Sequence, residues 1–195
     1  MFDRLFEILE TKPDFRYYHL DAHTVLIEDY LEIRPEKERM LRDYISQGRI
    51  LVGPWYSLPE EFVVSGESLV RNLLVGHRVA NKFGNVMNVG YTPTSCGQIS
   101  QLPQIYAGFD VNSVLFYRGI NPHDAKAEFI WQGADGTKLL AFHFYTYGRA
   151  NFFALLLDRM LFGGHRELSD EEKKKKFHFK GTQYQNLHET VDPMN

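Results

Sequence analysis

Apolar residues near the start of the chain follow a helical spacing. They recur at i, i+3, i+4 and i+7, as Phe2, Leu5, Phe6 and Leu9, which predicts an amphipathic helix that begins almost at Met1. Lys12-Pro13 then breaks the pattern, and residues 15–20 are rich in aromatic residues that favour strands. We expect a short buried strand there, ending at Asp21.

Helical and extended patterns continue to alternate after this strand. Thr24 is placed to cap a helix over residues 25–33, and Pro35 suits an early position of a second helix that Gly48 ends. The apolar stripe of this second helix consists of Met40, Leu41, Tyr44 and Ile45. Residues 50–52 form the second expected strand.

A long helix is expected from Ser65 to a C-terminal cap at Gly84. Its small-residue centre suits close packing on a sheet, and its predicted buried face consists of Leu69, Leu73, Gly76, Ala80 and Phe83. A strand over 86–89, a short helix over 101–107 and a strand over 113–117 follow. This order predicts an α/β fold with a mainly parallel sheet flanked by helices.

Ligand sites in parallel α/β folds lie beyond the carboxyl ends of the strands. The sequence therefore places candidate functional residues at Asp21, Trp55, 91–97 and Arg118.

The last third of the chain has a different pattern. Asp135-Gly136 separates apolar runs at 128–132 and 138–145, which predicts a β-hairpin. We expect an apolar helix over 152–162 and, after Gly163-Gly164, a frayed polar segment. The predicted organisation is one domain over 1–165 and a polar tail over 166–195.

Composition and charge narrow the class of protein. The 195 residues are 44% hydrophobic, which is enough for a core, and the net charge of −3 argues against a nucleic-acid partner. The single cysteine, Cys96, excludes an internal disulfide and a Cys-clustered zinc site. Because no window resembles a signal peptide or a membrane span, we expect a cytoplasmic protein without a membrane partner.

Two clusters of potential ligands allow more than one interpretation. His19, Asp21 and His23 alternate, and on an extended strand they would share a face that could bind a metal. Short Asp/His turns arise readily, however, so a polar turn before Thr24 is favoured. Glu60 and Glu61 are adjacent and point in different directions, which is typical of a solvated loop rather than an acid/base pair.

The sequence gives only weak support for a serine or cysteine nucleophile. Ser65 and Asp21 could join a histidine in a hydrolase triad, but no G-x-S-x-G motif is present and a helix cap explains Ser65 better. Cys96 has no cation nearby in sequence, so a structural thiol is favoured over a reactive one. The lysine run at 173–176 is interpreted as part of a solvated tail.

Four runs of sequence carry a resemblance to a known family. They are YYHLDAHTVLIEDYLEIRPEKE, LVGPWYSLPEEFVVSGESLVRNLLVGHRVA, VGYTPTSCGQISQLPQI and SVLFYRG. From about Phe2 to about Tyr147 the chain resembles the bacterial branch of glycoside hydrolase family 38, the α-mannosidases. The resemblance implies a partial glycoside hydrolase/deacetylase-type barrel from a retaining, zinc-dependent mannosidase, in which one carboxylate attacks the anomeric carbon and a second protonates the leaving oxygen.

The resemblance also assigns roles to residues. The family's nucleophile loop reads Gly-Tyr-x-Pro-Asp-x-Phe-Gly and corresponds to residues 90–97, so Tyr91 is a candidate substrate-binding residue. Thr94 stands at the nucleophile position, where the family Asp also binds zinc, and Cys96 stands where a Phe stacks on the sugar. Arg118 matches an arginine beside the nucleophile. Trp55, a further candidate for substrate binding, matches a family position together with Glu67 and Gln104.

Zinc is not expected to be retained. A neutral hydroxyl at Thr94 replaces neither a nucleophile nor an anionic ligand well. In the family, the other ligands come from a His-x-Asp motif expected upstream of Met1 and from a His expected downstream of Asn195. His19 and Asp21 match a later strand, where the family usually shows Leu-Asp-Gly-Gln. We therefore assign no metal ligand in this chain.

Three hypotheses about function stay open. The chain is a fragment or altered copy of an α-mannosidase catalytic domain, related to mannosides or oligosaccharides but without its own activity; or a noncatalytic carbohydrate-binding or partner module; or one part of a split enzyme. The first is favoured because loss of nucleophile and metal costs many orders of magnitude in rate. An unpaired sheet edge before the first strand would also favour a homo-oligomer.

Overall fold

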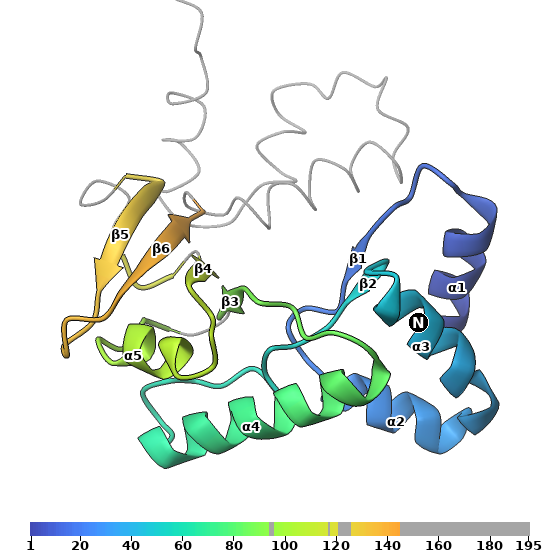
Figure 1. Ribbon diagram of the computed structural model, residues 1–195, viewed down its shortest axis with the longest axis horizontal. Coiled ribbons are helices and arrows are strands. Elements are labelled where there is room, and N and C mark those ends of the chain that lie inside the picture. The colour runs from blue at the N-terminus through green and yellow to red at the C-terminus, as the bar shows by residue number, and fades with distance from the viewer. Residues whose placement is uncertain (94–95, 117, 121–125, 145–195) are drawn as a thin grey trace, which may run out of the picture. The chain divides into compact units, whose positions relative to one another are not determined.

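The structure is a computed structural model that describes residues 1–93, 96–116, 118–120 and 126–144. Figure 1 draws the other residues as a thin grey trace. The chain divides into two compact units, Met1–Gly148 and Arg149–Asn195, and every described residue belongs to the first. The helix expected over 152–162 and the domain boundary at 165 lie outside the described residues.

Helices and strands alternate as the sequence predicts. The helical elements of the described ranges are α1 (Phe2–Thr11), α2 (Val25–Ile33), η1 (Pro35–Lys37), α3 (Glu38–Ser46), α4 (Gly66–Phe83) and α5 (Leu102–Ala107). The strands are β1 (Tyr18–His19), β2 (Ile50–Leu51), β3 (Gly90–Tyr91), β4 (Ser113–Phe116), β5 (Glu128–Gln132) and β6 (Lys138–His143). None of these helices combines the length and the apolar character that crossing a bilayer requires.

The strands form two sheets that are mainly parallel. β1 pairs with β2, and a second sheet has the order β3-β4-β6-β5. All pairs are parallel except β5 with β6, which are antiparallel with Ile130 opposite Leu140. A single parallel bridge joins Val52 to Val86 between these ladders. The mixed α/β class with a parallel sheet is confirmed, and the described strands do not close into a barrel.

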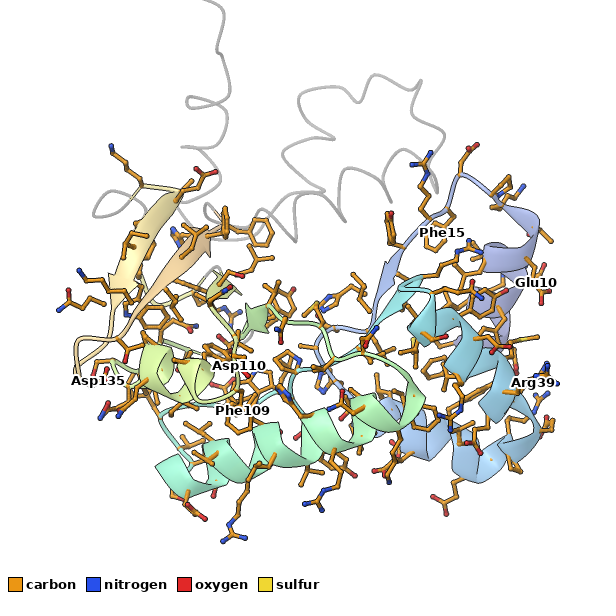
Figure 2. The ribbon with its side chains drawn as sticks, in the orientation of Figure 1. Glu10, Phe15, Arg39, Phe109, Asp110 and Asp135 are labelled. Carbon is orange, nitrogen blue, oxygen red and sulfur yellow. The ribbon has the colours of Figure 1, made fainter. Side chains whose placement is uncertain are left out.

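Two apolar clusters form the core. The first gathers α1 and α3 around β2, and all four residues of the predicted stripe in α1 are buried in it. The second lies around β4 and β6 and includes Trp55, Leu73, Tyr106 and Phe116. Phe109, which is labelled in Figure 2, packs against this cluster, and its ring centroid lies 5.0 Å from that of His77 of α4.

Two expected strands are shorter than predicted. The amides of Tyr18 and Leu20 donate to the carbonyl oxygens of Arg49 and Leu51, both at 2.9 Å, but the carbonyl of Phe15 accepts instead from the Arg49 guanidinium at 3.0 Å. The strand predicted over 86–89 is only a bridge at Val86, because the partner strand turns away at Gly53, whose φ is +78°. The next ladder begins at Gly90.

The two predicted N-caps differ in backbone geometry. Ser65 is extended, with ψ of 155°, and its hydroxyl accepts the amide hydrogen of Ser68 at 3.2 Å, so this cap is confirmed. Helix α2 begins at Val25 as expected, but Thr24 has ψ of −19° and makes no side-chain cap bond to the first turn. A cap residue needs the extended region for its oxygen to reach that turn. The backbone amide of Thr24 donates to the carbonyl oxygen of Trp55, at 3.0 Å, and so ties the start of α2 to the segment after β2.

Candidate functional site

The parallel strands bring several of the predicted site residues to one edge of the second sheet. β3, β4 and β6 are neighbours and run in the same direction, so their carboxyl ends share an edge. At this edge lie the residues that follow Tyr91, the turn at Arg118, and His143, the last residue of β6. This is the edge at which parallel α/β folds place ligands.

The segment after β3, here called the 92–99 loop, is held by the side chain of Gln98. The Thr92 hydroxyl donates to Gln98 Oε1 at 2.8 Å. Gln98 Nε2 donates in turn to the carbonyl oxygens of Thr92 and Arg118, each at 3.4 Å. The loop is thereby linked to the turn that follows β4.

Glu60 and Glu61 hold the same loop from the other side. Glu60 Oε2 accepts the amide hydrogen of Cys96 at 3.1 Å, and Glu61 Oε2 accepts that of Ile99 at 2.9 Å. Glu61 is only 3% exposed. The solvated-loop interpretation is therefore wrong for Glu61, because burying a carboxylate requires such bonds in compensation.

Two glycines let neighbouring segments approach this loop closely. A Cβ on Gly97 would lie 2.6 Å from Cε2 of Phe62. A Cβ on Gly119 would lie 2.8 Å from the Gln98 nitrogen, and the φ of +104° at Gly119 disfavours other residues in any case. The loop is thus packed between Phe62, from the segment after β2, and Gly119, from the turn after β4.

The candidate residues for substrate binding are Trp55, Tyr91 and Cys96, and those for catalysis are Thr94 and Arg118; the described ones differ in their exposure to solvent. Trp55 is fully buried in the second cluster, 5.7 Å from the ring of Tyr106, and Tyr91 is buried with its ring 5.1 Å from His19. Cys96 and Arg118 are exposed. Thr94 lies outside the described residues, so its assignment, like the substrate contacts of the others, stays a prediction.

Burial also governs protonation beneath the 92–99 loop. Burial, and secondly the carboxylate charge of Glu61, raise the pKa of the Tyr106 hydroxyl. Tyr106 therefore stays neutral at physiological pH. Its ring also supports the start of the site strand, because a Cβ on Gly90 would meet ring atoms of Tyr106 at 2.6 Å.

Asp21 and His23 lie in the predicted polar turn, and His19 ends β1 as expected. His19 Nε2 accepts the amide hydrogen of Ala22, and His23 Nδ1 accepts that of Leu58, both at 3.2 Å. Asp21 and Ala22 have left-handed φ values of 48° and 62°. Because these nitrogens already bind backbone hydrogens, the turn does not fit a zinc site, and no group of three His, Cys, Asp or Glu residues in the described ranges does.

His143 is a residue of this edge that sequence reasoning missed. It ends β6, is 3% exposed, and its ring lies 5.5 Å from that of Phe116. Period-two alternation was the available signal, since Leu139, Ala141 and His143 share the buried face of β6.

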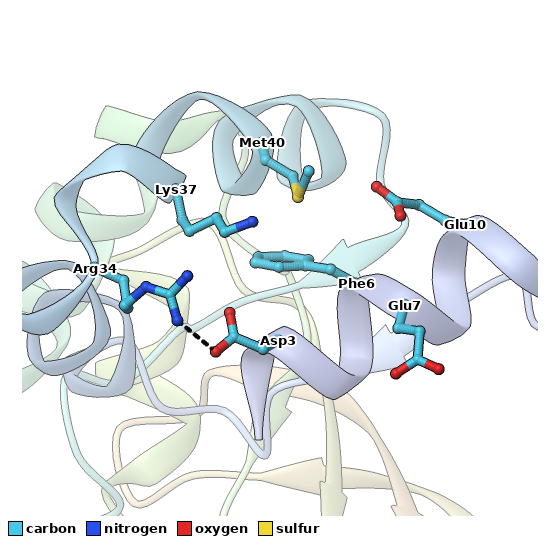
Figure 3. A pocket seen from close by; sticks show the side chains of 7 residues that line it. All are labelled: Asp3, Phe6, Glu7, Glu10, Arg34, Lys37 and Met40. Carbon is cyan, nitrogen blue, oxygen red and sulfur yellow. Dashed lines mark hydrogen bonds and ion pairs between the residues drawn. The ribbon is translucent and has the colours of Figure 1, made fainter.

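A separate shallow pocket lies between α1 and the η1–α3 segment. Phe6 and Met40 contribute its apolar lining, and Arg34 makes a 2.9 Å ion pair with Asp3 across it (Figure 3). The exposed carboxylates of Glu7 and Glu10 and the half-buried Lys37 complete its lining with charges of both signs. This arrangement selects no particular ligand charge.

Comparison with protein-family models identifies the family of this chain. The family model described as "Glycosyl hydrolases family 38 N-terminal domain" matches residues 1–194. The chain therefore belongs to glycoside hydrolase family 38, as an α-mannosidase-like domain.

Two curated relatives match part of the chain. A Halalkalibacterium halodurans protein named "Putative mannosylglycerate hydrolase" is 39% identical over 153 residues, which cover 72% of this chain and 17% of the relative. The Homo sapiens protein named "Alpha-mannosidase 2C1" is 26% identical over 148 residues, covering 71% and 14%. The match thus spans less than a fifth of the length of either relative.

Solved structures give the same fold. An alpha-mannosidase from Enterococcus faecalis V583 is 34% identical with a TM-score of 0.70, over 73% of this chain and 16% of that one. A family 38 protein from Enterococcus faecalis is 27% identical with a TM-score of 0.64, over 85% and 19%. A 4-alpha-glucanotransferase from Thermococcus litoralis, at 16% identity and a TM-score of 0.62 over 77% and 25%, shares the fold alone.

Proposed function

We propose that this chain is a mannoside-binding segment of an α-mannosidase-like catalytic domain and that it has no hydrolytic activity by itself. One observation carries the proposal: the strand-end loop is fastened by Gln98, Glu60 and Glu61, while Thr94 replaces the carboxylate that the family resemblance requires. A fixed loop is suited to binding, whereas an unactivated hydroxyl is a weak nucleophile. In this proposal the described strands are part of a larger, barrel-like domain.

Release of a chromogenic aglycone from an α-mannoside tests the lack of activity. We expect no turnover from the chain or from Thr94→Asp, because a returned carboxylate still lacks the metal and the general acid, and such groups act as a unit. Thr94→Asn, which has nearly the same shape as Asp without its charge, is the matched control. Turnover by Thr94→Asp clearly above Thr94→Asn would refute this account.

Binding is tested separately by titrating the isotope-labelled chain with methyl α-mannoside. We expect chemical-shift changes among the amides of Cys96, Gly97 and Gln98, and smaller ones with a β-galactoside. The absence of any change at millimolar sugar would refute the mannoside-binding role.

Family 38 enzymes are generally zinc-dependent, and we propose that this chain does not bind zinc tightly. The support is the bonding of His19 and His23 to backbone amides, which occupies nitrogens that a metal would need. Calorimetry on chelator-treated protein checks this proposal. A stoichiometric site of submicromolar affinity would overturn it, and His19→Ala and His23→Ala would then show whether the turn supplies it.

The alternative function is a noncatalytic partner module. It is supported by the exposed side chains of Phe62, which lies against Gly97, and of Val63, at 66% and 80%. Exposed apolar side chains of this kind favour protein contacts. Under this alternative, Phe62→Ser would abolish partner binding while the response to mannoside stayed absent. We further propose a cytoplasmic location, from the single unpaired cysteine.

A further inference from the structure

The pair Glu60-Glu61 makes two contacts with one loop that is distant in sequence. The bonded amides, Cys96 and Ile99, lie 36 and 38 residues away from their acceptors. Adjacent side chains on an irregular segment diverge, so the two carboxylates reach amides three residues apart. Gly97 lies between these amides, against the ring of Phe62.

The segment that carries the two carboxylates is itself anchored at several points. His23 Nδ1 accepts the Leu58 amide hydrogen at 3.2 Å. Asn72, in the middle of α4, accepts the amide hydrogens of Tyr56 and Ser57 at 2.8 and 3.1 Å and donates to the Ser57 carbonyl at 2.8 Å. The segment from Tyr56 to Glu61 is therefore hydrogen-bonded to α4 at its start and to the 92–99 loop at its end.

The chemistry of the two acceptors suits a holding role. A carboxylate that accepts a backbone amide hydrogen makes a charge-assisted bond, which is stronger than a bond between neutral groups. Glu61 is buried, and a buried carboxylate that lost its amide partner would carry a large desolvation cost. Neither acceptor depends on the identity of residue 94, since both bonds are to the backbone.

We propose that Glu60 and Glu61 are positioning residues that fix the backbone of residues 96–99, immediately after the position of the family nucleophile. The proposal rests on the proposed function for its role in mannoside binding. The amide bonds themselves exist whether or not a sugar binds.

Amide hydrogen exchange in the full chain, measured by NMR, tests the positioning role. We expect Glu61→Ala to speed exchange at Ile99 by on the order of tenfold or more relative to the amides of Val114 and Ala141 in the sheet. Glu60→Ala should act mainly on Cys96. Glu61→Gln keeps an acceptor oxygen, so it should restore much of the protection at Ile99.

Glu38→Ala is the matched control, because it removes an exposed glutamate that makes an ion pair with Arg42 on the same helix, at 2.8 Å. It should leave Cys96 and Ile99 unchanged. If Glu61→Ala does not fold, Glu60→Ala still tests the bond to Cys96, and Glu61→Gln tests whether a neutral acceptor protects Ile99 less well than the carboxylate does. Unchanged exchange at Cys96 and Ile99, or an equal rise at the sheet amides, would overturn the proposal.

Titration of the same variants with methyl α-mannoside separates this proposal from the proposed function. We expect Glu60→Ala to weaken mannoside binding severalfold without lowering the melting temperature by more than Glu38→Ala does, which a purely structural role would not produce. Unchanged affinity in a variant with a loosened loop would refute the positioning role. No binding by the unmodified chain would refute the proposed function, while the exchange data would still decide whether the two carboxylates hold the loop.

Discussion

Replacing Gly76 by alanine tests how closely α4 packs on the chain that leads into the site. In the structure, α4 runs along the turn after β2 (Figure 1), and the two approach closely at Gly76. A Cβ on Gly76 would overlap the Pro54 carbonyl oxygen and lie 2.5 Å from Trp55 C and 2.6 Å from Tyr56 N. These are backbone atoms, so they cannot rotate away as a side chain would.

Two opposing terms set the size of the effect. Alanine in a helix interior is favoured over glycine by about 1 kcal/mol. Overpacking a filled site costs about 1–3 kcal/mol, and a clash with three backbone atoms belongs at the upper end of that range. We therefore expect a net loss of about 2 kcal/mol, or a fall in melting temperature of about 4–8 °C for a chain of this size.

Denaturant and thermal unfolding measure this difference, with Gly66→Ala as the matched control. Gly66 is the first residue of the same helix, and a Cβ there would meet no atom within 4 Å. We expect this control to stay within about 0.5 kcal/mol of the unmodified chain. If Gly76→Ala is as stable as Gly66→Ala, the close packing of α4 on residues 54–56 is wrong.

Two further predictions concern the N-terminal helices and the sheet edge. Burial, and then the 2.7 Å hydrogen bond that Tyr30 donates to Asp3, raise the pKa of Tyr30 from 10.0 to about 12. The stabilisation that this pKa shift represents is complete below pH 10 and is lost as pH rises to about 12. The difference in unfolding free energy between the chain and Tyr30→Phe, measured by denaturant unfolding, should therefore become smaller over that range. A difference that stays constant would contradict this prediction. We also propose that the outer edge of β1 pairs with a second copy, so light scattering should give twice the 22.8 kDa of one chain, and a clean monomer would exclude such pairing.

Local patterns predicted the helices well because the relevant physics is local. The stripe of α1 and the buried face of α4 follow from helical spacing, and both are found as expected. The sequence predicts some strands that are longer than the observed ones, because the length of a strand depends on a partner elsewhere in the chain. The partner of residues 86–89 turns away at Gly53, and no pattern within 86–89 reports that turn.

The sequence predicts where the candidate site residues lie in the fold but not how they are bonded. The alternation of helices and strands predicts a parallel sheet and so places candidate residues in the loop after β3 and at Arg118. Glu61, by contrast, accepts a hydrogen bond from an amide 38 residues away in sequence. Adjacent carboxylates look solvated when only their neighbours in sequence are considered. Only the fold shows that one of them is buried and bonded.

The bonding of the loop and the chemistry of position 94 are therefore separable properties of this chain. Cys96 and Ile99 donate their backbone amide hydrogens to Glu60 and Glu61. The Gln98 side chain donates to the carbonyl oxygens of Thr92 and Arg118 and accepts from the Thr92 hydroxyl. A substitution at position 94 removes none of these groups. Under the proposed function, replacement of the nucleophile would remove the chemistry without removing the groups that bond residues 96–99, so we expect the proposed mannoside-binding role to be independent of the residue at position 94.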